Sequence, residues 1–232
     1  MNITQELSNI LKEAGCEIFG FADLKCIPKE MRQLFSCGIL IALPFPKEAL
    51  QENINGNPQQ YYEARISLEK RLRGFSTMTA NFLLSKGFNS MANVPTSVVT
   101  DTEELRTILP YKTVATLAGV GWIGKCAALV TEKAGSAMVL TTVYTTAPLE
   151  CGTPITKSRC PEECTVCKDI CPGNAPLGGS WEVGVDRDAF FNPHKCKEFG
   201  SARGKELINV ESQWGCGLCL AHCPFTRKAV GY

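Results

Sequence analysis

The sequence has almost no net charge and no long apolar run. Its 24 Lys and Arg residues nearly balance its 23 Asp and Glu residues, for a formal net charge of +1 over 232 residues. Such a balance supplies no electrostatic attraction to nucleic acid or to an anionic membrane. No apolar stretch approaches the ~20 residues that a membrane-spanning helix needs. We therefore expect neither a membrane segment nor a nucleic-acid partner.

The N-terminus lacks the apolar stretch of a secretory signal peptide, because it carries charges at Glu6, Lys12, Glu13 and Glu17. We therefore expect a cytoplasmic protein. Disulfides are rare in that reducing compartment, so the 13 cysteines need another explanation. Histidine is also scarce, with His194 and His222 only, and we expect both to cap or solvate loops.

Two proline-terminated cysteine runs lie in the last third of the chain. The first is Cys160-x3-Cys164-x2-Cys167-x3-Cys171-Pro172, and the second is Cys216-x2-Cys219-x3-Cys223-Pro224. This is the ligand pattern of two [4Fe–4S] clusters, in which the last cysteine of each run binds the cluster of the other run. Zinc sites of four cysteines favour paired C-x2-C knuckles and do not need the x3-Cys-Pro tail. The spacing therefore predicts two iron–sulfur clusters and a redox function.

The number of ligands can be checked against the number of cysteines. Two clusters need eight thiolates, whereas the runs contain four and three cysteines. The bacterial pattern would place the eighth at position 213, which is Gln, so the isolated Cys196 is the candidate. The two predicted ligand sets are Cys160, Cys164, Cys167 and Cys223, and Cys171, Cys196, Cys216 and Cys219. The gap between Cys160 and Cys164 is one residue longer than usual. Cys151 therefore stays open as an alternative ligand to Cys160.

The remaining sequence predicts an α+β protein. Apolar periodicity and Gly or Pro stops indicate helices at 3–14, 61–86, 102–109 and 112–118, and strands at 16–22, 38–43, 88–94, 127–131 and 137–145. The last two strands are expected to form a hairpin around the turn 132–135, and 51–58 reads as a loop. After Pro148 the sequence becomes dense in Gly, Pro and Cys, which suggests an α/β domain over 1–149 and a cluster domain over 150–232. The cysteines outside the ligand sets are expected by default to be small buried hydrophobic residues: Cys16, Cys26, Cys37, Cys126 and Cys151.

The segment Gly119–Lys125 matches G-x-G-x-x-G by letter. A dinucleotide site needs a strand before these glycines and a helix after them, whereas the expected order here is helix, glycines, strand. We therefore reject that interpretation. Two others remain open. The loop could approach a cofactor through Gly119, Gly121, Trp122, Gly124 and Lys125, or it could be a tight turn that packs Trp122 into the core.

The stretch from Lys112 to Lys125 is similar to the A-G-L-G-W-I-G-K signature of epoxyqueuosine reductases, which are relatives of corrinoid-dependent reductive dehalogenases. The segment Thr145–Leu149 and the paired cysteine runs that follow agree with the same family. The resemblance covers nearly the whole chain. It is a resemblance to short double-cluster relatives without the C-terminal helical-repeat region that binds tRNA in the reductases.

The resemblance implies a nitroreductase-like α/β core that holds a corrinoid, followed by a two-cluster ferredoxin-like module. Electrons would come from a low-potential donor such as a ferredoxin or flavodoxin and reduce a small substrate through the corrinoid, of the cobalamin type. Asp101 is the nearest match to the proton-donating Asp of the reductases; alternatively, it caps the helix expected at 102–109. Two other functions stay open: a ferredoxin-like electron carrier without corrinoid, and a reductive activator of a corrinoid protein.

Overall fold

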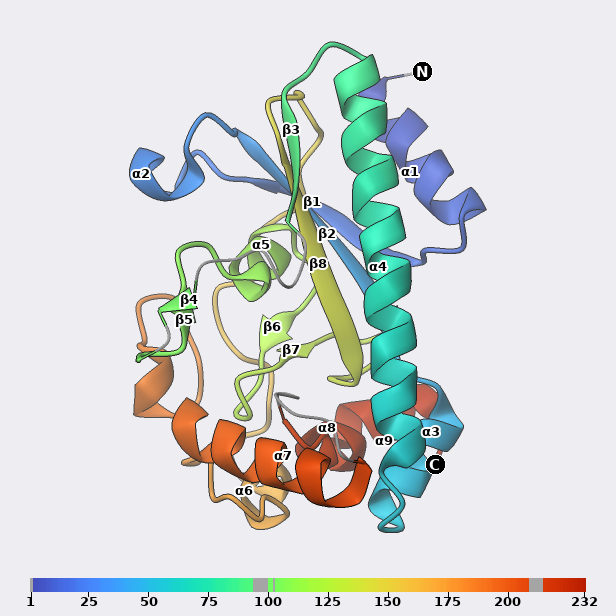
Figure 1. Cartoon of the computed structure of the whole chain (residues 1–232). Coiled ribbons are helices and arrows are strands. Elements are labelled where there is room, and N and C mark those ends of the chain that lie inside the picture. The colour runs from blue at the N-terminus through green and yellow to red at the C-terminus, as the bar shows by residue number, and fades with distance from the viewer. Residues whose placement is uncertain (1, 94–99, 102, 209–214) are drawn as a thin grey trace. The chain divides into compact units, whose positions relative to one another are not determined.

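A computed structural model describes residues 2–93, 100–101, 103–208 and 215–232 (Figure 1). These residues form two compact units, each assembled from segments that are not contiguous in sequence. Unit 1 contains Met1–Leu43, Ser67–Val120 and Val139–Ile155. Unit 2 contains Pro44–Ile66, Gly121–Met138 and Thr156–Tyr232. This division differs from a single boundary near residue 150, because unit 2 takes two earlier segments from the first part of the chain.

A four-stranded sheet with the order β1-β2-β8-β3 is the centre of unit 1. Its strands are β1 (Ile18–Asp23), β2 (Cys37–Pro44), β8 (Met138–Thr145) and β3 (Ser90–Asn93). β1 pairs antiparallel with β2, with Ile18 opposite Ala42, and β3 pairs antiparallel with β8. All of β2 is buried except Pro44, as expected of an interior strand covered on both faces.

The helices of unit 1 are α1 (Ile3–Glu13), the short α2 (Lys29–Arg32) in the connection between β1 and β2, the larger part of α4 (Gln59–Ser85) and α5 (Tyr111–Leu117). The Asn2 side chain caps α1 by accepting a hydrogen bond from the Gln5 amide at 2.9 Å. α5 packs against β1, and small residues allow this approach, since a Cβ on Gly38 of β2 would lie 2.9 Å from Val114 Cγ1.

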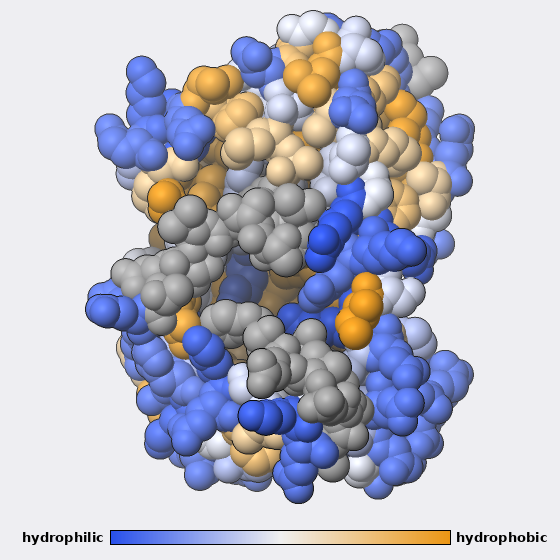
Figure 2. All heavy atoms as spheres, viewed as in Figure 1, coloured by the Kyte–Doolittle hydropathy of each residue, from blue (hydrophilic) through white to orange (hydrophobic). Residues whose placement is uncertain are grey.

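Unit 2 consists mainly of helices, most of them short, and one small strand pair. Its elements are α3 (Lys47–Ile54), the first turns of α4, the antiparallel pair β6 (Trp122–Ile123) and β7 (Leu129–Val130), α6 (Val166–Asp169), the 3-10 turn η1 (Arg187–Ala189), α7 (Pro193–Ile208), α8 (Leu218–His222) and α9 (Pro224–Val230). One small core cluster joins Ile123, Ala127 and Phe190. On the face drawn in Figure 2, the residues of unit 2 are mostly hydrophilic. None of the helices in the described ranges could cross a membrane.

The helix predicted for 102–109 is wrong. Thr100–Asp101 and Arg106–Thr107 form the short antiparallel strands β4 and β5 instead, with Asp101 opposite Arg106. Leu105 adopts a left-handed conformation with φ 54°, which no residue inside a right-handed helix can have. Asp101 therefore does not cap a helix here.

The hairpin predicted between 127–131 and 137–145 is also wrong. β7 pairs with β6, a strand inside the glycine segment, and β8 joins the main sheet. The turn itself is present, since Thr131 and Gly135 exchange backbone hydrogen bonds of 2.8 and 2.9 Å. The segment 51–58 is only partly a loop, because α3 continues to Ile54.

We expect Gly38→Ala to destabilise the protein by about 1–3 kcal/mol, because the new methyl group would overpack Val114 in the core. The matched control is Gly74→Ala in α4, where a Cβ meets no atom within 4 Å. That change should stabilise by about 0.5–1 kcal/mol, since Ala favours helix. Thermal unfolding of both variants measures the difference, and equal melting temperatures would contradict the close α5–sheet packing.

Candidate functional site

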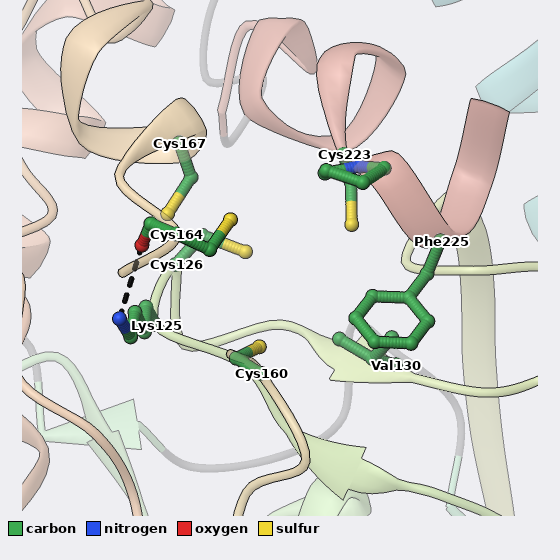
Figure 3. A pocket seen from close by; sticks show the side chains of 10 residues that line it. Lys125, Cys126, Val130, Cys160, Cys164, Cys167, Cys223 and Phe225 are labelled. Atoms are coloured by element: carbon green, nitrogen blue, oxygen red, sulfur yellow. Dashed lines mark hydrogen bonds between the residues drawn. The ribbon is translucent and has the colours of Figure 1, made fainter. Parts of the chain in front are cut away.

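A cavity in unit 2 brings together the four cysteines of one predicted ligand set. Cys160, Cys164, Cys167 and Cys223 line it, together with Cys126. Figure 3 shows these side chains around one space, with the 160–167 segment on one side and Cys223 on the other. The rest of the lining consists of Gly124, Lys125, Val130, Pro224 and Phe225. Residues far apart in the sequence thus line one cavity.

The donor set of this cavity fits an iron–sulfur cluster, because cysteine thiolates are the usual ligands of such clusters. Among the described residues, no group of three or more His, Cys, Asp or Glu side chains is placed to hold one metal ion. Zinc draws its thiolates to about 2.3 Å from a single centre, whereas a [4Fe–4S] cluster is bound by four cysteines around a larger body. Glycine at position 124 allows Val130 to pack closely beside the cavity, since a Cβ there would lie 2.8 Å from Val130 Cγ2.

Lys125 fixes the first cysteine run. It is only 5 % exposed. Its Nζ donates a hydrogen bond to the backbone oxygen of Glu162 at 2.6 Å and one to that of Cys164 at 3.0 Å, which Figure 3 shows as a dashed line. Glu162 lies in the gap that is one residue longer than usual. The ammonium group therefore closes the longer loop around the cavity, so the extra residue does not displace Cys160 from the lining.

Cys223 stands between α8 and α9, at the last position of the second run. Pro224 follows it as the first residue of α9, where the missing amide proton of proline costs no helical hydrogen bond. Burial raises the pKa of the Cys223 thiol, and hydrogen bonds from the Thr226 and Phe225 backbone partly oppose this. The same amides are placed to stabilise a thiolate ligand.

The other four cysteines also lie near one another in unit 2. Electrostatic interactions link Cys216 to Cys171, and link Cys219 to both Cys216 and Cys196. The Ala175 amide donates to Cys171 Sγ at 3.4 Å. Cys196 comes from α7, and a Cβ on Gly215 would be 3.9 Å from its sulfur. Position 213, where the bacterial pattern has a cysteine, lies outside the described residues.

Asn53, which the sequence analysis placed in a loop, supports this second set. It is fully buried in α3, and its Nδ2 donates to the Cys216 carbonyl at 3.0 Å. Arg203 donates to the Asn53 Oδ1 at 2.8 Å and to the same carbonyl at 3.2 Å. Only the position of α3 beside α8 reveals this role, since an Asn in a polar segment carries no signal of its own.

Aromatic side chains pack around the second set. Tyr61 and Tyr62 are buried, and Tyr61 stacks on Phe45 with ring centroids 4.6 Å apart. A Cβ on Gly217 would collide with the Tyr61 ring, and Gly217 adopts a left-handed conformation with φ 75°. Burial is the main cause that raises the pKa of both tyrosines. These two residues belong to the core of unit 2, as expected for aromatics in an amphipathic helix.

The glycine segment Gly119–Lys125 packs closely against neighbouring parts of the chain. Trp122 is 1 % exposed. Its ring meets the Phe225 ring edge-on, with the centroids 5.0 Å apart. The Arg159 guanidinium carbon lies 5.4 Å from the centroid of the Trp122 ring. A Cβ on Gly121 would collide with the Val130 carbonyl, and one on Gly119 with the Thr153 carbonyl. The glycines thus permit close backbone contacts, and the described geometry agrees with the tight-turn interpretation of this segment.

Cys151 lies in unit 1, not among the cavity residues. Its Sγ is 3.9 Å from Cys37 Sγ, and burial together with Cys37 raises the pKa of Cys151 to about 12. Asp101 lies in β4, but its side chain falls outside the described residues. Its proposed catalytic role stays a prediction.

Cys126 is the residue of the site that the sequence analysis missed. It is buried as expected and lines the cavity. The Cys126 side chain and burial raise the pKa values of the Cys167 and Cys219 thiols. The ligands must therefore lose protons when metal binds.

No protein-family model matches the chain. In sequence it is similar to proteins named epoxyqueuosine reductase. One from Listeria monocytogenes is 28% identical over 201 residues, which is 82% of this chain and 48% of the relative. One from Aliivibrio fischeri is 28% identical over 191 residues, which is 79% of this chain and 47% of the relative. The chain thus spans about half the length of the curated relatives it matches, and the resemblance expected from the signature segment is confirmed.

Solved structures show the same fold. An epoxyqueuosine reductase in complex with a modified tRNA stem loop has a TM-score of 0.61 at 19% identity, covering 96% of this chain and 65% of its own. A reductive dehalogenase described as B12-dependent has a TM-score of 0.65 at 15% identity, covering 97% of this chain and 31% of its own.

We expect Lys125→Met to weaken the first ligand set. The change leaves the carbonyls of Glu162 and Cys164 without their donor, and a hydrogen bond to a charged group is worth about 1.5–3 kcal/mol. Iron bound per chain after anaerobic reconstitution should fall and the melting temperature should drop. Lys228→Met, at an exposed position of α9, is the matched control and should change neither. Unchanged iron content in Lys125→Met would contradict the anchoring role.

Proposed function

We propose that the chain is an iron–sulfur oxidoreductase that holds two [4Fe–4S] clusters in unit 2. The main support is the cavity lined by Cys160, Cys164, Cys167 and Cys223, which unites the first run with the last cysteine of the second. The interaction of Cys171 with Cys216 supports the reciprocal crossing. Reductase relatives and the cysteine spacing agree with a redox role.

The protein's own groups would hold and tune the clusters. When bound, such clusters accept and release single electrons. The eight cysteines supply thiolates, and the backbone amides at Ala175 and at the start of α9 donate hydrogen bonds to ligand sulfur. The buried Lys125 ammonium adds a positive charge beside the first set. Each of these favours negative charge at the ligands, which stabilises the reduced form.

We further propose that these electrons pass to a corrinoid and reduce a small substrate. This part rests on the fold shared with a reductive dehalogenase described as B12-dependent. The segment Gly119–Lys125 does not add support, because Trp122 is buried and the Lys125 ammonium already binds two carbonyls. Asp101 is kept as the proposed proton donor, and a ferredoxin or flavodoxin as the electron donor.

A ferredoxin-like carrier is the second candidate. The inward-facing glycine segment favours it, since a carrier needs the clusters and no corrinoid site. The third candidate, a reductive activator, would bind another protein's corrinoid.

Metal analysis tests the cluster assignment. Wild-type protein reconstituted without oxygen should contain about eight irons and eight sulfides per chain. Cys160→Ser should lose the first cluster and retain about four irons. Cys151→Ser serves as the matched control and should retain about eight, because this cysteine contacts Cys37 in unit 1. Full iron in Cys160→Ser with loss in Cys151→Ser would assign the ligand to Cys151 instead.

Cobalamin binding separates the candidate functions. We expect added cobalamin to bind the reduced, cluster-loaded protein and to raise its melting temperature, because a ligand that binds only the folded state stabilises it. Asp101→Asn should bind cobalamin as wild type does. A loaded protein without any cobalamin binding would favour the carrier, and a stable complex with a corrinoid protein would favour the activator.

A further inference from the structure

Two cysteines outside the predicted ligand sets lie close together in unit 1. The Sγ atoms of Cys37 and Cys151 are 3.9 Å apart, although the residues are 114 positions apart in the sequence. Cys37 is the first residue of β2 and is buried, whereas Cys151 follows β8 and is half-buried. Neither residue lines the cluster cavity. The fold of unit 1 therefore creates a dithiol that the proposed clusters do not use.

Backbone contacts with β1 hold both cysteines of this dithiol. Cys37 lies opposite Asp23 in the register of the β1–β2 pair. Cys151 is followed by Gly152, whose amide donates a hydrogen bond to the carbonyl of Phe21, also in β1, at 2.8 Å. The same strand thus positions the chain at both cysteines. The short distance between the two sulfurs therefore follows from the backbone and not only from two side-chain rotamers.

Two thiols in contact can be oxidised to a disulfide by a low-molecular-weight disulfide. One protein thiolate attacks this oxidant, which forms a mixed disulfide and releases one small thiol. The second protein thiolate attacks the mixed disulfide, which forms the protein disulfide and releases the other small thiol. The two protein thiols lose two electrons and two protons, and the small disulfide gains them. Burial and the Cys37 thiol raise the pKa of Cys151, so this exchange is slow at neutral pH.

We propose that Cys37 and Cys151 are a reversible redox pair, oxidised to a disulfide by small disulfides and reduced again by small thiols. The pair does not depend on the proposed clusters. The half-buried Cys151 is the side from which a small reagent reaches the sulfurs. The bond would join the segment after β8 to the start of β2. Because it closes a long loop, it would restrict the unfolded chain and stabilise the folded one.

The test incubates anaerobically reconstituted full-length protein with glutathione disulfide, blocks the remaining thiols and maps disulfides by mass spectrometry. We expect one pair of peptides joined through Cys37 and Cys151, which separates again after treatment with dithiothreitol. The melting temperature of the oxidised wild type should rise by about 5–15 °C. Cys37→Ser and Cys151→Ser should show neither effect. Cys16→Ser is the matched control and should behave as wild type, because this buried thiol of unit 1 contacts the Ile18 and Ala42 carbonyls.

Mapping of the wild type decides the proposal even if a variant does not fold. Two thiols that remain open to blocking after long incubation with excess oxidant would overturn it, and so would glutathione attached to both cysteines without a bond between them. Loss of iron in Cys151→Ser would make this residue a cluster ligand and also overturn the pair. Fewer than about eight irons in the wild type, with the linked peptides present, would overturn the proposed function and leave the redox pair standing.

Discussion

The hydrogen bonds of the buried Lys125 ammonium are the interaction on which the cluster unit depends. A buried cation is tolerated only with close partners, and here the partners are two carbonyls of the first cysteine run. The bonds join the β6–β7 turn to that run and so determine where three ligands and Cys126 stand. They also place a positive charge beside a site whose thiolates are negative. Structure and electrostatics thus depend on the same side chain.

The small number of buried apolar side chains in the C-terminal part of unit 2 explains why this unit includes earlier segments of the chain. Its C-terminal part, from Thr156 on, contributes few fully buried apolar side chains, chiefly Ala175, Phe190 and Ala221. Trp122 from β6 packs on Phe225, and Phe45 stacks on Tyr61. These borrowed aromatics supply part of the apolar contact that the tail lacks. A small module with so little core usually also depends on bound metal for its stability.

Local patterns explain which elements were predictable. The apolar period of α1 and α4 and the continuous apolar run of β2 predict these elements within a few residues. The helix predicted at 102–109 is wrong because Leu105 adopts a left-handed conformation, which the sequence does not signal. The wrong hairpin arises because Trp122–Ile123, expected as a loop, pairs with β7. The placement of Cys126 in the cavity lining depends on that same unexpected pair, so the cysteine spacing gave no signal for it.

The crossing of the two runs has a consequence for folding. Cys223 belongs to the second run but stands with the first set, and Cys171 belongs to the first run but interacts with Cys216. Neither set can therefore be completed until both runs are in place. The chain between them includes α7, whose Arg203 holds the Cys216 carbonyl. Since metal binding supplies folding free energy only to a completed site, we infer that the two sets form cooperatively.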